Sequence, residues 1–363
     1  MRLAPIIERF ETPLLEKYGP RLTDDIRRAL LAMKHCRDGE SLHWLAFCEQ
    51  CATTLAKPHS CGNRSCPHCQ HGSGQDWLQR QTLQLLPVNY YMVTFTLPAQ
   101  LRTLAFDHQR IVYHAMLSAS WQTLAKFGHN DPRLAVDIGA SAVLHTHSRR
   151  RDYHPHVHLV VPAGGINLKQ NIWRAKGGKY LFNARNLAKV FAGKLNAALS
   201  ADGLILPPTL PKQWIAHCKR VGNGIKTLQY LSRYLYRGVL SEKDIIGCAD
   251  GKVTFKYING KTNKTESRTL DGADFLWMLL QHVLPKGFRR SRDFGLLHPR
   301  RKILLSMVQL LLNVHIIPHK LEPHKPLCCH ECGTPMRIYA TRIPFLTAQS
   351  IASRAQAARS AAV

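Results

Sequence analysis

The chain is poor in acidic residues. Only 23 aspartates and glutamates stand against 50 lysines and arginines in 363 residues, which gives a formal net charge of +27. Such an excess of positive charge repels itself unless a polyanion lies nearby, so nucleic acid is the expected partner. An anionic membrane surface is the alternative. It is disfavoured because the charge is spread through segments that look folded rather than gathered in an amphipathic tail.

The sequence also lacks a long hydrophobic run. Its longest apolar stretch, residues 303–317, has 15 residues and contains Gln309, Asn313 and His315. This stretch is too short and too polar to span a bilayer and is typical of a core helix. Residues 1–13 contain no signal-peptide core. We therefore expect a soluble cytoplasmic protein, in which eleven cysteines indicate metal ligation rather than disulfides.

Six of these cysteines gather between residues 36 and 69. Two pairs have the spacing of a zinc ribbon, in which each Cys-x2-Cys turn gives two thiolates and two turns complete a tetrahedron. The pairs are Cys48 with Cys51 and Cys66 with Cys69, and we predict that they bind one structural Zn²⁺. Four neighbours could serve a second zinc or replace one of these ligands, and the spacing leaves that choice open. These neighbours are Cys36, His43, His59 and Cys61.

A smaller group of the same residue types lies near the C-terminus. Cys328, Cys329 and Cys332, with His319 and His324, form half of a ribbon and are a weaker candidate for another zinc. The residues after 348 are rich in alanine, serine and arginine, which predicts a disordered tail or a loose helix.

Residues 154–162 read as a strand with an unusual pattern of histidines. Side chains two apart in an extended chain point to the same side, so His154, His156 and His158 share one face. Apolar residues fill the other face. Imidazoles side by side on a rigid strand make a poor core and a good platform for a metal ion.

A second strand, residues 141–147, precedes this one. If residues 149–152 form a four-residue hairpin loop, His145 falls directly opposite His156. Cross-strand partners lie about 5 Å apart on one face. His145, His156 and His158 would then form a three-histidine site. His145 is the least secure of the three ligands, because a register change of one residue would remove it.

The elements predicted between residues 89 and 221 follow the order β, α, β, β, α, β. This order is that of a split βαβ antiparallel sheet with helices packed on one face, which makes the fold class α+β. A further helix is predicted over residues 225–237. Tyr230 and Tyr234 lie four residues apart on one face of it, and Arg233 and Arg237 repeat the spacing beside them. A helical tyrosine usually belongs to the core. The histidines and the positive charge favour a functional role here.

These motifs together resemble a known family. His156-Val157-His158 matches the His-hydrophobic-His (HUH) signature, and it lies upstream of a Tyr-x3-Tyr helix. The set resembles the two-tyrosine rolling-circle transposases of the IS91 group of bacterial insertion sequences. The resemblance covers most of the chain and includes the N-terminal cysteines, residues 95–98 and the run 282–288. One departure is Ser241-Glu242-Lys243-Asp244, where the family usually has a different run, and it puts local contacts there in doubt.

The resemblance implies a mechanism and a set of partners. Mg²⁺ or Mn²⁺ at the histidines would assist attack by Tyr230 or Tyr234 on single-stranded DNA, giving a 5′-phosphotyrosine and a free 3′-hydroxyl. Imidazoles alone would favour zinc or another transition metal. The expected partners are single-stranded DNA at the element ends and target, and host replication or helicase machinery, because no helicase-type phosphate-binding loop is present. The protein would be bacterial and associated with the nucleoid, with no membrane partner. An oligomer is left open.

Four domains are expected on this basis. Residues 1–75 form a helical and zinc-binding domain, 76–240 an HUH nuclease domain, 241–320 a basic hairpin–helix extension that binds DNA, and 321–363 a zinc knuckle and flexible tail. The extension contains a predicted hairpin over residues 252–270 with an Asn259-Gly260 turn. The residues expected to contact DNA are Arg233, Arg237, Lys286, Arg289, Arg290 and Arg292.

Three other functions remain open. A plasmid relaxase or replication initiator would share the HUH motif. A zinc-ribbon regulator without catalysis would need neither the histidine strands nor the paired tyrosines. A three-histidine zinc hydrolase of small molecules would not need the high positive charge.

Overall fold

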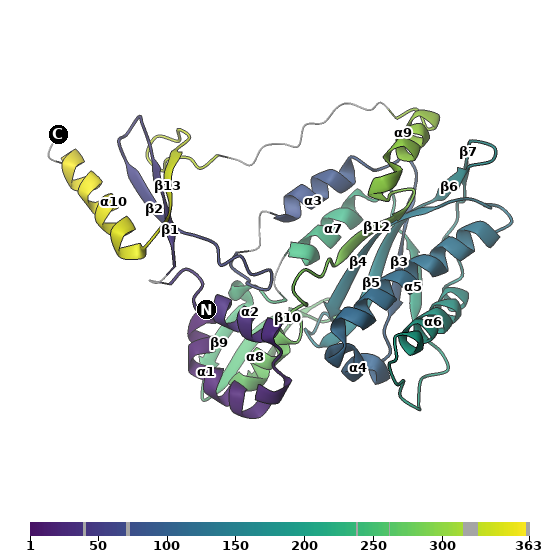
Figure 1. The fold of residues 1–363 in the computed structure, drawn as a ribbon, viewed down its shortest axis with the longest axis horizontal. Helices are drawn as coiled ribbons and strands as arrows, with labels where there is room; N and C mark the ends of the chain where they lie inside the picture. Colours follow the sequence, from purple (N-terminus) through teal and green to yellow (C-terminus); the bar gives the residue numbers. More distant parts are fainter. Residues whose placement is uncertain (39–40, 70–72, 237–238, 261, 315–325, 361–363) are drawn as a thin grey trace.

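The computed structural model describes residues 1–38, 41–69, 73–236, 239–260, 262–314 and 326–360 (Figure 1). Among these residues, no helix is both long enough and apolar enough to cross a membrane. Short 3₁₀ turns join several elements, at Gly19–Arg21, Ala99–Leu101, Glu242–Asp244 and Pro299–Arg301.

A five-stranded antiparallel sheet forms the centre of the structure, with the strand order β12-β4-β5-β3-β8 (Figure 1). Its strands are β3 (Tyr90–Thr96), β4 (Gly139–His147), β5 (Tyr153–Pro162), β8 (Ala216–Arg220) and β12 (Ser291–Gly295). The three inner strands are rich in the β-branched and aromatic residues that favour a pleated, buried surface. The predicted order β, α, β, β, α, β is confirmed, as is the α+β class, and β12 adds an edge strand.

Helices cover both faces of this sheet (Figure 1). One face carries α4 (Arg102–Asp107), α5 (Gln109–Asn130) and α6 (Ala184–Ala201), and the other carries α3 (Ser73–Thr82) and α7 (Ile225–Tyr236). Along β5, Val157 and Leu159 belong to the core beneath α5 and α6, whereas Val160 packs with α7. The prediction placed helices on one face. The structure adds α3 and α7 on the second face, which is the one that carries the histidines.

The β4–β5 hairpin differs from the prediction in its loop and agrees at the histidines. His147 pairs with Tyr153, so residues 148–152 form a loop of five residues instead of four. A register shift between His145 and His147 compensates for the extra loop residue, and His145 pairs with His156 as expected. A bulge of this kind adds one residue to one strand and restores the pairing beyond it.

The N-terminal helices α1 (Leu3–Tyr18) and α2 (Asp24–Lys34) pack against α8 (Gly272–Leu280), which is far along the chain (Figure 1). Thr23 caps α2 by accepting a hydrogen bond from the Ile26 amide at 3.4 Å. Gly272 is required at the contact, because a Cβ there would lie 2.2 Å from the Phe10 ring.

A second sheet, of order β11-β10-β9, lies beside α8. Its strands are β9 (Ile245–Ala249), β10 (Lys252–Ile258) and β11 (Thr265–Asp271). The predicted hairpin over residues 252–270 is therefore present, formed by β10 and β11. Residues 241–320 are shared between two parts of the structure, because β9–β11 and α8 join the N-terminal helices while β12 joins the central sheet.

The remaining elements form smaller units. The hairpin β6 (Gly164–Asn167) and β7 (Ile172–Ala175) extends from the central sheet, and α9 (Lys302–Leu311) begins near the predicted position 303 and ends earlier than predicted. A third sheet, of order β13-β1-β2, joins β1 (His43–Phe47) and β2 (Thr54–Pro58) to β13 (Arg337–Ile343). The C-terminal helix α10 (Phe345–Ser360) lies beside this sheet (Figure 1).

His282, from the run 282–288 noted in the sequence, fixes the β4–β5 loop. Its two ring nitrogens lie 3.1 Å from the Thr146 hydroxyl and 3.1 Å from the Arg151 carbonyl oxygen. Thr146 is the residue at the register shift, and Arg151 has a positive φ of 73°. His282 is buried, and this burial lowers its pKa from 6.5 to about 4. The imidazole is therefore held neutral, with one nitrogen protonated to donate to the Arg151 carbonyl.

We expect His282→Gln to reduce the acid sensitivity of the fold. Below pH 6.5 the unfolded chain binds a proton at His282, whereas the folded chain does so only near pH 4, so stability falls as the pH drops through this window. The shift of the His282 pKa corresponds to about 3 kcal/mol. Urea unfolding at pH 7.5 and pH 4.5 should show a smaller pH-dependent loss for the variant. Equal losses in the two proteins would contradict this role.

Candidate active site

Three histidines meet on the face of the central sheet that carries α7. His145 comes from β4, and His156 and His158 come from β5. Their ring centroids are separated by 5.2 Å (His145–His156), 4.6 Å (His145–His158) and 4.8 Å (His156–His158). One ligand nitrogen from each ring lies within 4.8 Å of the others. The structure thus brings together the three residues that the sequence predicted as metal ligands.

The electrostatic setting keeps these rings neutral. Burial is the main cause that lowers the pKa of all three, to about 4 for His156 and well below the usual value for His145 and His158. The charge that each ring would carry also disfavours protonation of its neighbours. A neutral imidazole presents a lone pair, so the cluster is ready to bind a cation near neutral pH.

Hydrogen bonds fix the orientation of two of the rings. His156 donates from Nδ1 to the carbonyl oxygen of His154 at 2.7 Å, which leaves its Nε2 as the ligand atom. His158 Nδ1 lies 2.8 Å from the hydroxyl of Thr94, the residue opposite it on β3. His154 itself is outside the cluster, because its Nδ1 accepts from Arg102 at 2.7 Å. Partners of this kind set the ring tautomer and raise metal affinity. No spacing in the sequence points to Thr94, because it reaches His158 only through the pairing of β3 with β5.

Tyr230 on α7 faces the histidines. The helix is anchored by Leu228, Leu231 and Leu235, which pack on the sheet. This spacing turns the Tyr230 ring to 6.5 Å from His145 and 6.4 Å from His158, measured between ring centroids. The side chain is 37% exposed, so a ligand can reach it.

The other residues predicted on this helix are only partly placed. Tyr234 lies one turn further along α7, and its side chain is outside the part of the chain that the structure describes. Arg237 is also outside the described residues. Arg233 is on α7 and is exposed to solvent.

Two arginines from separate segments approach the histidines. Arg290 is half-buried and donates to the Leu235 carbonyl at 3.4 Å, which ties the end of α7 to the residues before β12. Arg64 donates to the Phe288 carbonyl at 2.6 Å. Both arginines line a small cavity of about 30 Å³ together with His145 and His147. Positive charge therefore borders the histidine cluster.

A larger groove of about 1300 Å³ opens beside the edge strand β12. Arg289 and Arg292 line it, and Trp77, Phe288 and Phe294 supply aromatic surface. Other basic side chains along it are Arg80, Arg110, His114, His298 and Lys302. Lys286 lies at the approach to the groove, where its carbonyl oxygen accepts from Arg110 at 2.7 Å. The predicted basic residues 286–292 thus border either the groove or the histidine site.

The cysteines are not grouped as the sequence predicted. Cys48 and Cys51 do not meet Cys66 and Cys69. Instead, Cys66 and Cys69 join Cys36 and Cys61, and Cys48 and Cys51 join two C-terminal cysteines, Cys329 and Cys332. The expected single ribbon was wrong because the loop that follows β2 carries Cys61, Cys66 and Cys69 toward α2, away from the β1–β2 turn.

Two histidines considered as zinc ligands lie outside both cysteine clusters. His43 is buried on β1, with its Nδ1 2.8 Å from the Ser41 carbonyl oxygen. His59 Nε2 accepts from the Arg342 amide at 3.3 Å. His319 and His324 fall outside the described residues.

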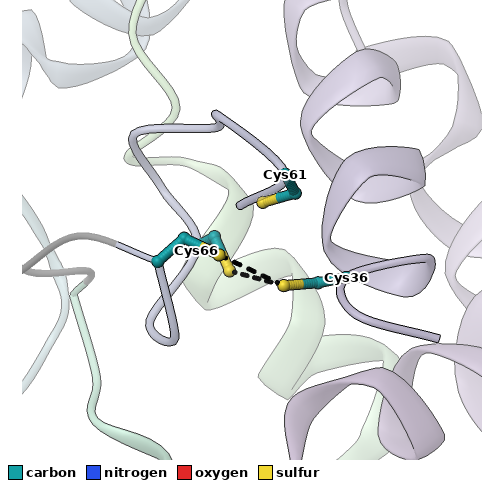
Figure 2. Close-up of side chains that lie close together, drawn as sticks. Cys36, Cys61 and Cys66 are labelled. Carbon is teal, nitrogen blue, oxygen red and sulfur yellow. Dashed lines mark hydrogen bonds between the residues drawn. The ribbon is translucent and has the colours of Figure 1, made fainter. Parts of the chain in front are cut away.

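Figure 2 shows Cys36, Cys61 and Cys66 with their sulfur atoms turned toward one another. The Cys36 sulfur lies 3.4 Å from that of Cys69 and 3.5 Å from that of Cys66. Sulfurs in a zinc tetrahedron lie about 3.8 Å apart, because the Zn–S distance is about 2.3 Å. Burial raises the pKa of Cys36 to about 12, so these thiols would lose their protons to a metal rather than to water. Four sulfur donors at this spacing fit Zn²⁺.

This zinc cluster is connected to the active-site region. His68 lies between Cys66 and Cys69, and its Nδ1 is 3.2 Å from Oε2 of Glu242. Oε1 of Glu242 accepts a hydrogen bond from the Leu3 amide at 3.0 Å. Arg64, in the same cysteine loop, reaches the cavity beside His145. The cluster therefore fixes a loop that borders the histidines.

Comparisons with known proteins agree with these features. Residues 139–303 match the family model described as "Putative transposase", and residues 6–97 match "Transposase zinc-binding domain". "Putative transposase y4qJ" of Sinorhizobium fredii is 29% identical over 326 residues, covering 83% of this chain and 81% of that protein. The "Transposase for insertion sequence element IS801" of Pseudomonas savastanoi pv. phaseolicola is 28% identical over 366 residues, covering 85% of each.

One solved structure, "Conjugative Relaxase TrwC in complex with mutant OriT Dna", covers 62% of this chain and 74% of its own, with 16% identity and a TM-score of 0.27. A TM-score this low does not establish a common fold. The two domain matches and the two relatives, each covered over more than four fifths of its length, indicate a transposase with an N-terminal zinc-binding domain. The chain is thus similar to insertion-sequence transposases over most of its length, and its N-terminal part is similar to the transposase zinc-binding domain of the IS91 kind.

We expect Thr94→Val to weaken metal binding at the histidines without unfolding the protein. The change keeps the side-chain shape but removes the hydroxyl that holds His158. Loss of such a partner typically costs about 10- to 100-fold in metal affinity. Calorimetric titration with Mn²⁺ measures the effect. Thr123→Val is the matched control, because Thr123 is also buried and its hydroxyl donates within α5, to the Ala119 carbonyl oxygen. Wild-type affinity in Thr94→Val would contradict the assignment.

Proposed function

We propose that this transposase cuts and rejoins single-stranded DNA by transesterification, with Tyr230 as the nucleophile that attacks a phosphate bound at the histidine cluster. The observation that carries the proposal is the position of the Tyr230 ring beside both His145 and His158. A phenol and a cation platform on the same face of the sheet can engage one phosphodiester.

The histidines would hold the metal ion that such chemistry requires. Mg²⁺ or Mn²⁺ bound to His145, His156 and His158 would supply positive charge against a non-bridging phosphate oxygen. The all-imidazole donor set favours Mn²⁺ or another transition metal over Mg²⁺, unless phosphate and water oxygens complete the coordination.

Tyr230 would perform the covalent step. Its oxygen forms a bond to phosphorus while the bond from phosphorus to the 3′-oxygen breaks, the phenol proton is lost to solvent, and the departing 3′-oxygen takes up a proton. The products are a 5′-phosphotyrosine and a 3′-hydroxyl. A tyrosine phenol in water has a pKa of about 10, so positive charge is needed to favour its anion. Arg290 and Arg64 provide that charge beside the histidines.

The phosphotyrosine bond also accounts for rejoining. It keeps the free energy of the original phosphodiester, so a 3′-hydroxyl can attack it and restore a DNA strand without a cofactor. A second tyrosine would let the protein hold one end while it cuts another. Tyr234, one turn along α7, is the proposed second nucleophile on the strength of the Tyr-x3-Tyr spacing.

The groove along β12 is the proposed path for the DNA strand. Basic side chains for the phosphates and aromatic rings for base stacking line the same groove, which is the combination used by single-strand binders. The Arg292 guanidinium lies 5.7 Å from the centre of the Phe288 ring. Arg290 lies directly before β12, next to Arg289 of this groove, and lines the cavity beside His145.

The covalent step can be tested directly. An oligonucleotide carrying the end of an insertion sequence is incubated with protein and Mn²⁺, and protein–DNA adducts are separated on denaturing gels. We expect Tyr230→Phe to reduce the adduct by at least about 100-fold, because it removes the attacking oxygen. Tyr180→Phe, an exposed tyrosine far along the chain from α7, should retain the wild-type yield. DNA cleavage that persists without an adduct in Tyr230→Phe would indicate attack by water and would overturn the proposal.

The DNA path makes a separate prediction. We expect Arg289→Ala to weaken binding of single-stranded DNA and to reduce the slope of log affinity against log salt by about 0.7, the value for one phosphate contact. Fluorescence anisotropy with a labelled oligonucleotide between low and moderate salt gives both quantities. Arg133→Ala, an exposed arginine away from the groove, is the control for net charge. Equal effects of the two substitutions would show that general charge, and not the groove, binds the strand.

A further inference from the structure

The second cysteine cluster joins the two ends of the chain. It consists of Cys48 and Cys51, from the turn between β1 and β2, and of Cys329 and Cys332, from the turn before β13. Their sulfurs all lie within 4.8 Å of one another, and those of Cys48 and Cys332 are 3.6 Å apart. The family match to a zinc-binding domain ends at residue 97, so it contains only half of this cluster.

The two halves have the same backbone geometry. The amide of Cys48 donates to the Thr53 carbonyl at 2.9 Å, and the amide of Cys329 donates to the Thr334 carbonyl at 2.9 Å. In each half the residue after the second cysteine has a positive φ, 53° at Ala52 and 73° at Gly333. A left-handed alanine is strained and persists only where its surroundings impose it. Both turns are therefore shaped to aim two sulfurs at a common point.

The two halves also hold each other. The Thr53 hydroxyl donates to Glu331 at 3.2 Å, and the Thr334 hydroxyl donates to Gln50. Behind the turns, β13 pairs with β1 along its length. The buried apolar cluster behind the turns is small, consisting of Ala46, Cys48, Cys329 and Met336, and Leu45 of β1 and Ala348 of α10 are also buried. A core of this size does not hold a fold by itself, and small domains of this kind usually need a metal or disulfides. None of these four cysteines forms a disulfide in the structure.

We propose that Cys48, Cys51, Cys329 and Cys332 bind a second, structural Zn²⁺ that fastens the C-terminal segment to the N-terminal zinc-binding domain. Four thiolates in two Cys-x2-Cys turns are the donor set and spacing of a zinc ribbon. The sulfur separation of 3.6 Å is close to the value of about 3.8 Å for a zinc tetrahedron. This site goes beyond the proposed transesterase activity. It implies that the unit formed by β1, β2, β13 and α10 depends on zinc for its assembly.

Zinc content tests the proposal, measured by plasma mass spectrometry on the purified full-length protein. We expect two zinc ions per chain in the wild type and one in Cys329→Ser. Cys328→Ser is the matched control, because Cys328 is the adjacent residue and its sulfur lies near the Pro326 carbonyl, outside the cluster. It should retain two ions. We also expect trypsin to cut at Arg337 and Arg342 faster in Cys329→Ser than in Cys328→Ser.

Two results would overturn the proposal. One is an unchanged content of two zinc ions in Cys329→Ser, and the other is a single ion in the wild type. If Cys329→Ser fails to fold, cadmium-113 NMR of the cadmium-loaded wild type replaces it. Two resonances in the range of all-sulfur coordination would support two four-cysteine sites, and one resonance would refute the second site. Loss of DNA cleavage is not the readout, so failure of the proposed activity would leave this test unaffected.

Discussion

The antiparallel pairing of β4 with β5 is the constraint on which the candidate active site depends. It sets His145 opposite His156, and His158 follows on the same face two residues later. A slip of one residue would turn the His145 side chain to the opposite face of the sheet. A bulge in β5 opposite Thr146 preserves this register despite the longer loop, and His282 contacts Thr146 there. The run that begins at His282 thus has a structural role beside the histidine cluster.

A second constraint comes from the apolar stripe of α7. Its leucines pack on Val143 and Val160, which lie on the same face of the sheet as the histidines. Because the stripe fixes the rotation of the helix, Tyr230 is held over the cluster and cannot turn away without exposing those leucines. The packing of α7 on the sheet therefore places the Tyr230 phenol beside the cluster of histidines that can bind a metal ion. Arg64, from the cysteine loop, and Arg290 line the cavity beside His145.

Most local features could be read from the sequence, because they depend on short-range periodicity. The alternating histidines, the tyrosine spacing of α7 and the hairpin over residues 252–270 are of this kind. Features set by distant parts of the chain could not be read. The cysteines that complete the cluster of Cys48 and Cys51 are near the C-terminus. Thr94 contacts His158 because β3 pairs with β5. β12 joins the central sheet from a segment that was expected to form a separate domain. A spacing motif identifies half of a metal site and gives no information about the other half.

The central claim is that the Tyr230 oxygen becomes bonded to DNA phosphorus, and peptide mass spectrometry of the trapped adduct tests it most directly. Trypsin cuts after Lys226, Arg233 and Arg237, so it separates Tyr230 (residues 227–233) from Tyr234 (residues 234–237). With a single-stranded element end and Mn²⁺, we expect a nucleotide-bearing peptide at residues 227–233. Cleaved DNA with both peptides unmodified, or an adduct confined to residues 234–237, would contradict the assignment of Tyr230.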